Sequence, residues 1–598
     1  MEHLINKEII IDDPNDRNQL LVLFQKTLDY FKCRDGSKLV FFSMIGSRAF
    51  NLNIESSDQD FLGIFELDID RVLSLESYKS AMASTQNHRI LATNNQISNS
   101  NPIESLVIIT PDVSVHEIKQ FCKFILTGIP KITESLYLDR YNITTQQWEI
   151  ITKNRDSLFL TQVALDHYIS TVKALVLSVK ENVEGGKGRD SLNDRKNVFK
   201  QSYHAYRLLR EMIMILKNKT IITRFQDDDP DRKLLLSIRQ GQYTEQQCYD
   251  IISEKLKEFE VVHQQHRNSL VEKVDIHFLN NWLVSQRRQS IKESIARDGT
   301  SFSAFTFTES DNNLYKKGTE YLKQYNVDAT LLYFGKSGSN LYNLIKDENN
   351  TNDQDYFGFF AAPTDQIVSL FPPIIKIDVP NNQLIPNEEY ISVDLTPPPN
   401  KPSFGSKDAF AKGVLMYEIG YVMALLMNSS NRLTECLFVP NDDTSISYQS
   451  NAWIELKQQY THFLNRNLAQ QYWGLSKSEF QKITELQRKS KNGLVVMNWQ
   501  EVSVKLHHIF RLLLDCNRII NGQTPIITYP SDNENRQFLI SLKYPNQDIT
   551  EVTTQPLLDQ CKRELESTQK KVNQMKPFFR HEFLDTLNPW LIKLRKSL

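Results

Sequence analysis

The sequence lacks the features of a secreted, metal-stabilised or membrane-spanning protein. Its six cysteines lie far apart and form no Cys-x-x-Cys pair. That pattern argues against a disulfide framework or a structural zinc site and favours a reducing compartment. No run of about 18 apolar residues occurs, and the first residues contain no apolar signal segment. We therefore expect a cytoplasmic protein, with a nuclear one as the alternative, and no membrane partner.

The sequence also lacks an excess of one charge. Its formal net charge is −2 at pH 7, which excludes a surface that is basic all over, although a local basic groove is compatible with this total. The length of 598 residues exceeds what one hydrophobic core can organise, so about two to four domains are expected.

The chain contains the same series of passages twice, in the same order. The spacing between matched passages drifts only slightly, as short insertions would cause, so the chain consists of two homologous halves. The matched passages are Asp58-Gln-Asp60 with Asp353-Gln-Asp355, Lys131–Tyr137 with Arg432–Phe438, and Ser202–Glu211 with Leu506–Asp515.

The first half is organised around a glycine turn followed by two aspartates. Residues 38–45 form a β-rich apolar run that predicts a strand, and Gly46 with Ser47 ends it in a turn that can approach phosphate oxygens. Asp58 and Asp60 alternate along a second predicted strand, so both carboxylates leave the same face. Two adjacent carboxylates favour a shared cation, and magnesium is the expected one because it takes oxygen ligands. An Asp-x-Asp pair alone is more often only a solvated surface feature.

A third aspartate, Asp112, stands before an amphipathic pattern that predicts a helix starting near His116-Glu117, with Ile118, Phe121 and Ile125 on one face. It is either a charge at the helix N-terminus, favoured by the macrodipole, or a third carboxylate that lies close to the other two and handles a proton.

Residues 155–290 have a mainly helical pattern. His204, Arg207 and Glu211 are three and four residues apart and share one helix face. This stripe is equally compatible with a buried salt-bridge network and with a cleft that meets triphosphate oxygens. The basic stretch at residues 185–190 is either a linker or a loop that closes over a polyanion.

Hydrophobic-Gly-Ser followed about ten residues later by Asp-x-Asp resembles the signature of the polymerase-β-like nucleotidyltransferase superfamily. The further order of Asp112, His116-Glu-Ile-Lys, Gly128-Ile-Pro-Lys-Ile-Thr-Glu and Tyr203-His-Ala-Tyr-Arg resembles the predicted nucleotidyltransferase family associated with RNA repair. The resemblance covers most of residues 38–285. One departure is Gly128-Ile-Pro130, where that family commonly has Gly-Asn-Pro.

This resemblance implies an α/β (α+β) fold with two tandem mixed-sheet domains, each followed by a helical subdomain. We expect the boundaries 1–150, 151–290, 310–455 and 456–598. It further implies that Glu117, Lys119 and Glu134 occupy family positions whose roles are less certain. The implied site residues are Asp58, Asp60 and Asp112 as catalytic residues and Mg²⁺ (or Mn²⁺) ligands, with Gly46, Ser47, Arg48, His204 and Arg207 on the nucleotide.

The implied reaction is a two-metal transfer of a nucleoside monophosphate from a nucleoside triphosphate, such as ATP, to an acceptor hydroxyl. The attacking hydroxyl belongs to an RNA end in this reading, and pyrophosphate leaves. Two rival hypotheses are a catalytically inactive scaffold of the same fold and the same transfer onto a protein or small-molecule hydroxyl.

The second half departs from the pattern at chemically important positions. Alignment on Gly335 places Lys336 at the serine position, while Gly338-Ser339 offers a shifted alternative. Gly413 stands where Asp112 stands in the first half. We therefore expect the second half to be a degenerate, inactive copy.

Overall fold

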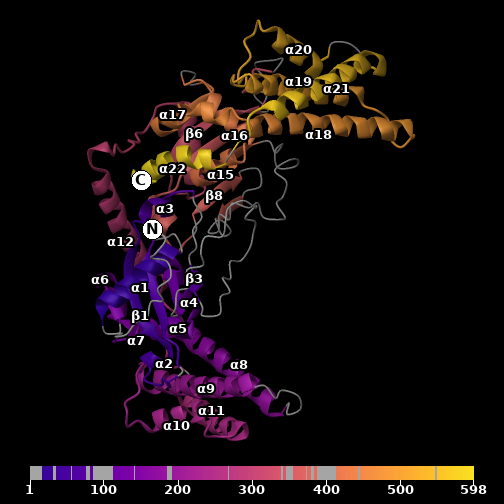
Figure 1. Cartoon of the computed structure of the whole chain (residues 1–598). Helices are drawn as coiled ribbons and strands as arrows, with labels where there is room; N and C mark the ends of the chain where they lie inside the picture. The colour runs from indigo at the N-terminus through magenta and orange to yellow at the C-terminus, as the bar shows by residue number, and fades with distance from the viewer. Residues whose placement is uncertain are drawn as a thin grey trace, which may run out of the picture. The chain divides into compact units, whose positions relative to one another are not determined.

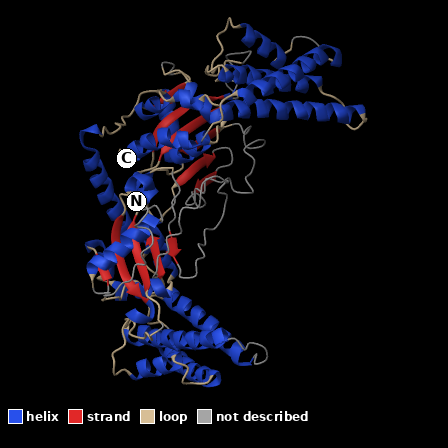
Figure 2. Ribbon diagram, viewed as in Figure 1, coloured by secondary structure: helices blue, strands red, loops and turns tan. Residues whose placement is uncertain are grey.

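The computed structural model divides into two compact units, each with its own mixed sheet and helices (Figures 1 and 2). Unit 1 comprises Met1–Val72, Tyr78–Ser294 and Val368–Phe371, and unit 2 comprises Leu73–Ser77, Ile295–Ile367 and Pro372–Leu598. The mixed α/β fold in two copies is therefore confirmed. The structure describes the whole chain except residues 1–15, 31–34, 56, 76–80, 85–111, 141, 185–191, 267, 339–340, 345–354, 372, 379–382, 387–412, 442–444, 546–548 and 579. The basic stretch at 185–190 lies outside the described residues.

The sheet of unit 1 has the strand order β3-β4-β2-β1-β5. β2 pairs antiparallel with β1 on one side and parallel with β4 on the other. The strands are β1 (Lys38–Ile45), β2 (Asp60–Glu66), β3 (Ala81–Ser84), β4 (Asp112–Glu117) and β5 (Asn142–Thr144).

Helices cover both faces of this sheet. One face is covered by α1 (Arg17–Tyr30), whose Leu20 and Phe24 are buried in one core with Val113 and Val115 of β4. On the opposite face, Leu62 and Ile64 of β2 join a second core with α4 and α8. Burying each such side chain stabilises the fold by about 1.5–3 kcal/mol, which fixes the register of the central strands.

The rest of unit 1 is helical, as the sequence pattern predicts, and α9 buries the expected apolar residues, including Leu209 and Met212. α12 returns to the sheet, where Trp282 and Leu283 enter the main core. The helices are α2 (Gly46–Ala49), α3 (Ile69–Leu73), α4 (Ile118–Thr127), α5 (Pro130–Ser135), α6 (Gln146–Thr152), α7 (Arg155–Leu158), α8 (Gln162–Glu184), α9 (Leu192–Asn218), α10 (Pro230–Arg239), α11 (Glu245–His266) and α12 (Ile276–Asp298).

Unit 2 repeats the central arrangement of unit 1. β7 pairs antiparallel with β6 and parallel with β10, in the sheet order β11-β6-β7-β10-β8-β9. Its strands are β6 (Thr330–Ser337), β7 (Asp355–Ala361), β8 (Ile374–Asp378), β9 (Gln383–Pro386), β10 (Val414–Glu418) and β11 (Ser447–Gln449). Its helices are α13 (Asn313–Gln324), α14 (Thr364–Val368), α15 (Ile419–Met427), α16 (Asn431–Glu435), α17 (Asn451–Lys457), α18 (Arg466–Lys491), α19 (Trp499–Ile520), α20 (Glu534–Lys543), α21 (Glu551–Gln574) and α22 (Arg580–Lys596).

Within the described part of the chain, no helix combines the length and the apolar character needed to cross a membrane.

Candidate active site

The turn after β1 brings Gly46 against Asp60. Ile45, the last residue of β1, pairs with Asp60, the first residue of β2. Gly46 has a φ of +69°, and a Cβ atom added to it would lie 2.6 Å from Oδ2 of Asp60. Any other residue would therefore combine backbone strain with a clash against this carboxylate. A glycine is required at this position because the turn packs directly on β2, the strand that begins with Asp60.

The parallel pairing of β2 and β4 places Asp112 directly opposite Asp60. Residues paired in register on neighbouring strands share a face of the sheet, so these two positions lie side by side. Asp58 is exposed two residues before Asp60, in the loop that enters β2. The register thus brings the three sequence-predicted acids to one end of two neighbouring strands, although the side chain of Asp112 lies outside the described residues.

Asp112 begins a strand, so the interpretation of this residue as an N-terminal helix charge is wrong. The predicted helix start near His116-Glu117 agrees with the structure to within two residues, since β4 continues through Glu117 and α4 starts at Ile118. Glu117 is the residue that caps α4, and its carboxylate accepts a hydrogen bond from the backbone N–H of Lys119 at 2.8 Å. A helix cap at that position satisfies one of the free N–H groups of the first turn.

Arg48 of α2 holds the loop that carries Asp58. Its Nη2 donates to the carbonyl oxygen of Ser57 at 2.8 Å, and its Nε lies 3.3 Å from the carbonyl oxygens of Ser57 and Asp58. Ser57 makes a hydrogen bond within the same loop, since its hydroxyl accepts from the backbone N–H of Ile54 at 2.7 Å. The guanidinium therefore fixes the backbone on which the Asp58 carboxylate stands.

The helical part of unit 1 holds the segment that follows α2. Arg232 donates from Nε to the carbonyl oxygen of Asn51 at 2.9 Å, and Arg239 donates to that of Leu52 at 2.7 Å. Asn51 adopts a φ of +60°, and its side-chain amide donates to the carbonyl oxygen of Phe225 at 3.0 Å. Figure 1 shows α2 between β1 and α9, which is the position these contacts require.

The stripe on α9 forms a buried ion-pair network. The guanidinium of Arg207 contacts Glu211 one turn along the helix and Glu134 of α5, the latter at 3.2 Å. All three residues are buried, and the guanidinium also stacks over the ring of Phe50 at 4.2 Å. The geometry matches the salt-bridge alternative from the sequence, and Arg207 links α9 to the residue directly after α2.

Burial and nearby charges shift the pKa values of His204 and Tyr203, which also lie on α9. Burial, together with the charges of Arg207, Lys200 and Arg239, lowers the pKa of His204 to about 3. Burial raises the pKa of Tyr203, and the negative charge of Asp60 adds to this rise, whereas Arg239 and Arg207 oppose it. The His204 imidazole is thus neutral and surrounded by cations at neutral pH.

In unit 2 the glycine turn aligns on Gly338, not on Gly335. Ser337 pairs with Asp355 as Ile45 pairs with Asp60, and Gly338 has a φ of +64°. The shifted alignment left open by the sequence is therefore the one that the strand register supports. Ser339 and Asp353 lie outside the described residues.

Unit 2 also repeats the contacts that fix the segment after the glycine turn. Asn343 has a φ of +56°, Arg536 donates to its carbonyl oxygen at 2.9 Å, and Lys543 donates to that of Leu344 at 3.2 Å. These contacts reproduce those of Arg232 and Arg239 in unit 1.

The buried ion-pair network is also repeated, with additions. Arg511 lies 3.3 Å from both Glu435 and Asp515. Tyr472 and Tyr342 donate from their hydroxyl groups to Glu435. Burial raises the pKa of Asp515 to about 7, although Arg511 opposes the rise.

Unit 2 has a glycine at the position that Asp112 occupies in unit 1. Val414 pairs with Tyr356 in the parallel ladder, so Gly413 takes the place opposite Asp355 that Asp112 takes opposite Asp60. The matching of Gly413 with Asp112, predicted from the sequence, agrees with this register. The backbone N–H of Gly413 donates to Oδ1 of Asp355 at 2.9 Å.

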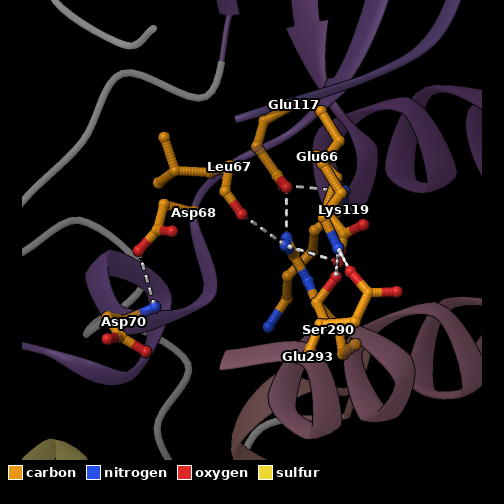
Figure 3. Close-up of polar contacts among 10 residues, drawn as sticks. Glu66, Leu67, Asp68, Asp70, Glu117, Lys119, Ser290 and Glu293 are labelled. Atoms are coloured by element: carbon orange, nitrogen blue, oxygen red, sulfur yellow. Dashed lines mark hydrogen bonds and ion pairs between the residues drawn. The ribbon is translucent and has the colours of Figure 1, made fainter. Parts of the chain in front are cut away.

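A second cluster of charged groups lies at the other end of the unit 1 sheet, and sequence reasoning missed it. Arg287 of α12 donates to Glu117 and to the carbonyl oxygen of Leu67, and its guanidinium lies 3.5 Å from the carboxylate of Glu66. Figure 3 shows Glu66 and Glu117 converging with Ser290 of α12. Six residues of strand, about 20 Å, separate Glu66 from Asp60.

The cluster joins α12 to the sheet. Arg287 is 1% exposed and Glu117 is fully buried, so each charge depends on the other for compensation. Unit 2 has the same pairing, since Glu418 caps α15 and Arg595 of α22 supplies the facing charge. In the sequence, the one sign of this cluster is a charged residue in the last helix of each copy. The spacing of residues does not reveal the carboxylate with which it pairs.

Among the described residues, no group of three or more His, Cys, Asp or Glu side chains gathers closely enough to hold a metal ion. The pair of carboxylates at Asp58 and Asp60, with position 112 opposite, nevertheless has the oxygen donors that a hard divalent cation takes.

A family model described as RNA repair pathway DNA polymerase beta family matches residues 22–285 and again residues 315–593. The chain belongs to this family. The RNA repair pathway DNA polymerase beta family supports a nucleotidyltransferase-like role, and polymerase-β-like nucleotidyltransferases usually use a divalent metal. The two matched ranges show that both halves of the chain are family copies. Searches of curated proteins and of solved structures found no match.

Proposed function

We propose that unit 1 transfers a nucleoside monophosphate from a nucleoside triphosphate to a hydroxyl at an RNA end and releases pyrophosphate. The observation that carries this proposal is the register that sets Asp112 opposite Asp60, beside the Gly46 turn. The acceptor oxygen forms a bond to the α-phosphorus, and the bond from that phosphorus to the leaving pyrophosphate breaks. The proton of the acceptor hydroxyl passes toward the carboxylates.

Asp58, Asp60 and Asp112 would hold the divalent cation, Mg²⁺ or Mn²⁺. When bound, that cation would neutralise phosphate charge and lower the pKa of the acceptor hydroxyl. In this proposal Asp112 orients or accepts the proton of that hydroxyl. Arg48 keeps the Asp58 loop in position, and Gly46 permits a close approach that any side chain would block.

The nucleotide side of the site is the edge formed by β1 and α2. Gly46 and Ser47 supply backbone N–H groups of the turn, and Arg48 lies beside them. Arg207 on α9 reaches the same region, since it stacks on Phe50 directly after α2, and we assign His204, one turn before it on the helix, to the nucleotide side as well. Arg207 acts in this proposal by holding that segment, because its charge is already balanced by Glu134 and Glu211.

Unit 2 is proposed to be inactive and to support unit 1. It keeps the glycine turn and the hold on the following segment, but it has Gly413 in place of the third acid and engages Asp355 with backbone. Asn340 stands where Arg48 stands in unit 1.

The test is transfer of label from each of four α-labelled nucleoside triphosphates, with Mg²⁺ or Mn²⁺, onto RNA oligomers and onto the protein itself. Wild type is compared with Asp58→Ala, Asp112→Ala and Asp353→Ala. Label that is lost with the first two changes and kept with the third supports an active unit 1. Label on the protein in place of RNA identifies a protein hydroxyl as the acceptor. Absence of both transfer and nucleotide binding in wild type favours the inactive scaffold.

A further inference from the structure

A polar strip continues from Asp112 along β4. Positions 112, 114 and 116 alternate along the strand and share the face on which Asp60 lies. Ser114 and His116 occupy the two positions after Asp112, each about 6.6 Å further along the strand. Both side chains are partly buried, and Nδ1 of His116 has no hydrogen-bond partner among the described residues.

A cation lies over this strip. Lys131 of α5 is exposed, and its Nζ donates to the hydroxyl of Ser114 at 3.1 Å. Burial lowers the pKa of His116 to about 4, and the charge of Lys131 contributes to this shift, so the imidazole is neutral beside the ammonium group. The Ser114 hydroxyl itself donates to the carbonyl oxygen of Phe61 at 3.3 Å, so it positions the ammonium group of Lys131, and that ammonium group is a suitable contact for a phosphate oxygen.

The sheet order places this strip on the acceptor side. β2 lies between β1, whose end carries the Gly46 turn, and β4, which carries the strip. If the triphosphate occupies the β1 side, the attacking hydroxyl approaches from the β4 side. An RNA strand whose 3′-hydroxyl lies at Asp112 would then pass Ser114 and Lys131, whereas His116 packs against the ring of Phe124 of α4.

Unit 2 has lost the strip together with the third acid. Leu415 and Tyr417 occupy the positions that match Ser114 and His116 in the parallel ladder. Tyr417 belongs to an apolar core there, and Leu415 packs against it. The copy that lacks the third acid thus has core-packing side chains where unit 1 has Ser114 and His116, as expected if the strip serves the reaction.

We propose that Lys131, positioned by Ser114, binds the phosphodiester next to the reacting 3′-hydroxyl of a polynucleotide acceptor. This inference rests on the proposed function, because it assigns the acceptor side of the same site. It adds Lys131 and Ser114 as residues that select an acceptor with a phosphate close to its hydroxyl.

The test measures binding of short fluorescent RNA strands by anisotropy, with a 3′-terminal linkage that is either a phosphodiester or an uncharged methylphosphonate. The proteins are full-length wild type, Lys131→Ala, Lys131→Arg and the control Lys153→Ala, which alters an exposed lysine after α6. Wild type, Lys131→Arg and Lys153→Ala should bind the phosphodiester strand about 10-fold more tightly than the methylphosphonate strand, as loss of a charged hydrogen bond implies. Lys131→Ala should bind both strands equally weakly.

The inference is overturned if wild type binds both strands equally, or if Lys131→Ala still distinguishes them. It is also overturned if wild type binds no RNA strand, which would point to a protein or small-molecule acceptor. Label transfer by wild type separates this failure from failure of the proposed function. Transfer that occurs without discrimination at the terminal linkage removes the inference and keeps the function.

Discussion

The backbone N–H of Gly413 donates a hydrogen bond to the carboxylate of Asp355. In unit 1 the position of this glycine is held by Asp112, which pairs with Asp60 in the parallel ladder. Unit 2 instead has a hydrogen bond within its sheet at this place. Asp355 therefore contributes to the stability of unit 2, and of these two matching aspartates we propose a cation-binding role for Asp60 alone.

Restoring the missing acid should not restore activity. Gly413 has a φ of +146°, a backbone angle that residues other than glycine rarely adopt. Gly413→Asp should therefore destabilise unit 2 by about 1–3 kcal/mol. Hydrogen exchange at the amide of Tyr356, which donates to the Gly413 carbonyl, reports this loss. Gly413→Ala is the control, since it introduces the same strain without a charge. Transfer activity in an Asp60→Asn, Gly413→Asp double variant would contradict this account.

Arg48 should affect the reaction through the position of Asp58. Arg48→Ala removes the hydrogen bonds to the Ser57 and Asp58 carbonyls, and a loop displaced by about 1 Å can reduce kcat/KM by about 100-fold. Lys at this position carries the charge but not the fork of donors, so Arg48→Lys should recover little. Mn²⁺ titration followed by electron paramagnetic resonance should show weaker binding in both variants. Unchanged metal affinity with a raised KM for the nucleotide would instead assign Arg48 to the phosphates.

Arg207 should prove chiefly structural. Arg207→Ala leaves Glu134 and Glu211 buried without a counter-charge, which should cost about 3–5 kcal/mol. Hydrogen exchange along α9 and urea unfolding measure this change. Arg488→Ala, in an exposed pair with Glu485, is the control and should leave the unfolding midpoint unchanged. A stable Arg207→Ala protein with a raised KM for the nucleoside triphosphate would support direct contact with triphosphate oxygens.

His204 should make unit 1 sensitive to acid. Burial and neighbouring cations lower its pKa in the folded state to about 3, from an ordinary value of 6.5. The unfolded chain therefore binds the proton first, and stability present above pH 6.5 is lost as the pH falls toward 3. Between pH 6.5 and 4, His204→Gln should lose less stability than wild type, measured by urea midpoints. Above pH 7 the two profiles should run parallel, and parallel profiles at acidic pH would refute the assignment.

The sequence was informative where chemistry and local pattern coincide. The internal repeat and the motif order that carries the family resemblance can both be read from the sequence alone, and the repeat and the fold class inferred from them are confirmed. Gly413 could be matched to Asp112 because the surrounding passages are similar in both halves. The Gly-Ser turn of unit 2 could not be placed, because two glycines compete there and only strand pairing distinguishes Gly338 from Gly335.

Contacts between distant segments were beyond sequence reasoning. Arg287 meets Glu117 across 170 residues, and Arg48 acts on carbonyl oxygens that no side-chain pattern marks. The short strand before α4 was not predicted, because Val113 and Val115 alternate with polar residues in a strand of only six residues that runs directly into the helix. The strip formed by Ser114 and His116 does have a signal, the period of two that starts at Asp112, but Lys131 becomes relevant only once α5 packs on the sheet.

The most direct test of the central claim, that unit 1 is the active copy, compares Asp60→Asn with Asp355→Asn in a single-turnover transfer of α-labelled nucleotide to RNA. These residues occupy matching positions in the two sheets, and both substitutions preserve side-chain size. We predict that Asp60→Asn lowers the transfer rate by at least about 100-fold, while Asp355→Asn keeps a rate close to that of wild type. Loss of transfer with Asp355→Asn and its retention with Asp60→Asn would contradict the account and assign the reaction to unit 2.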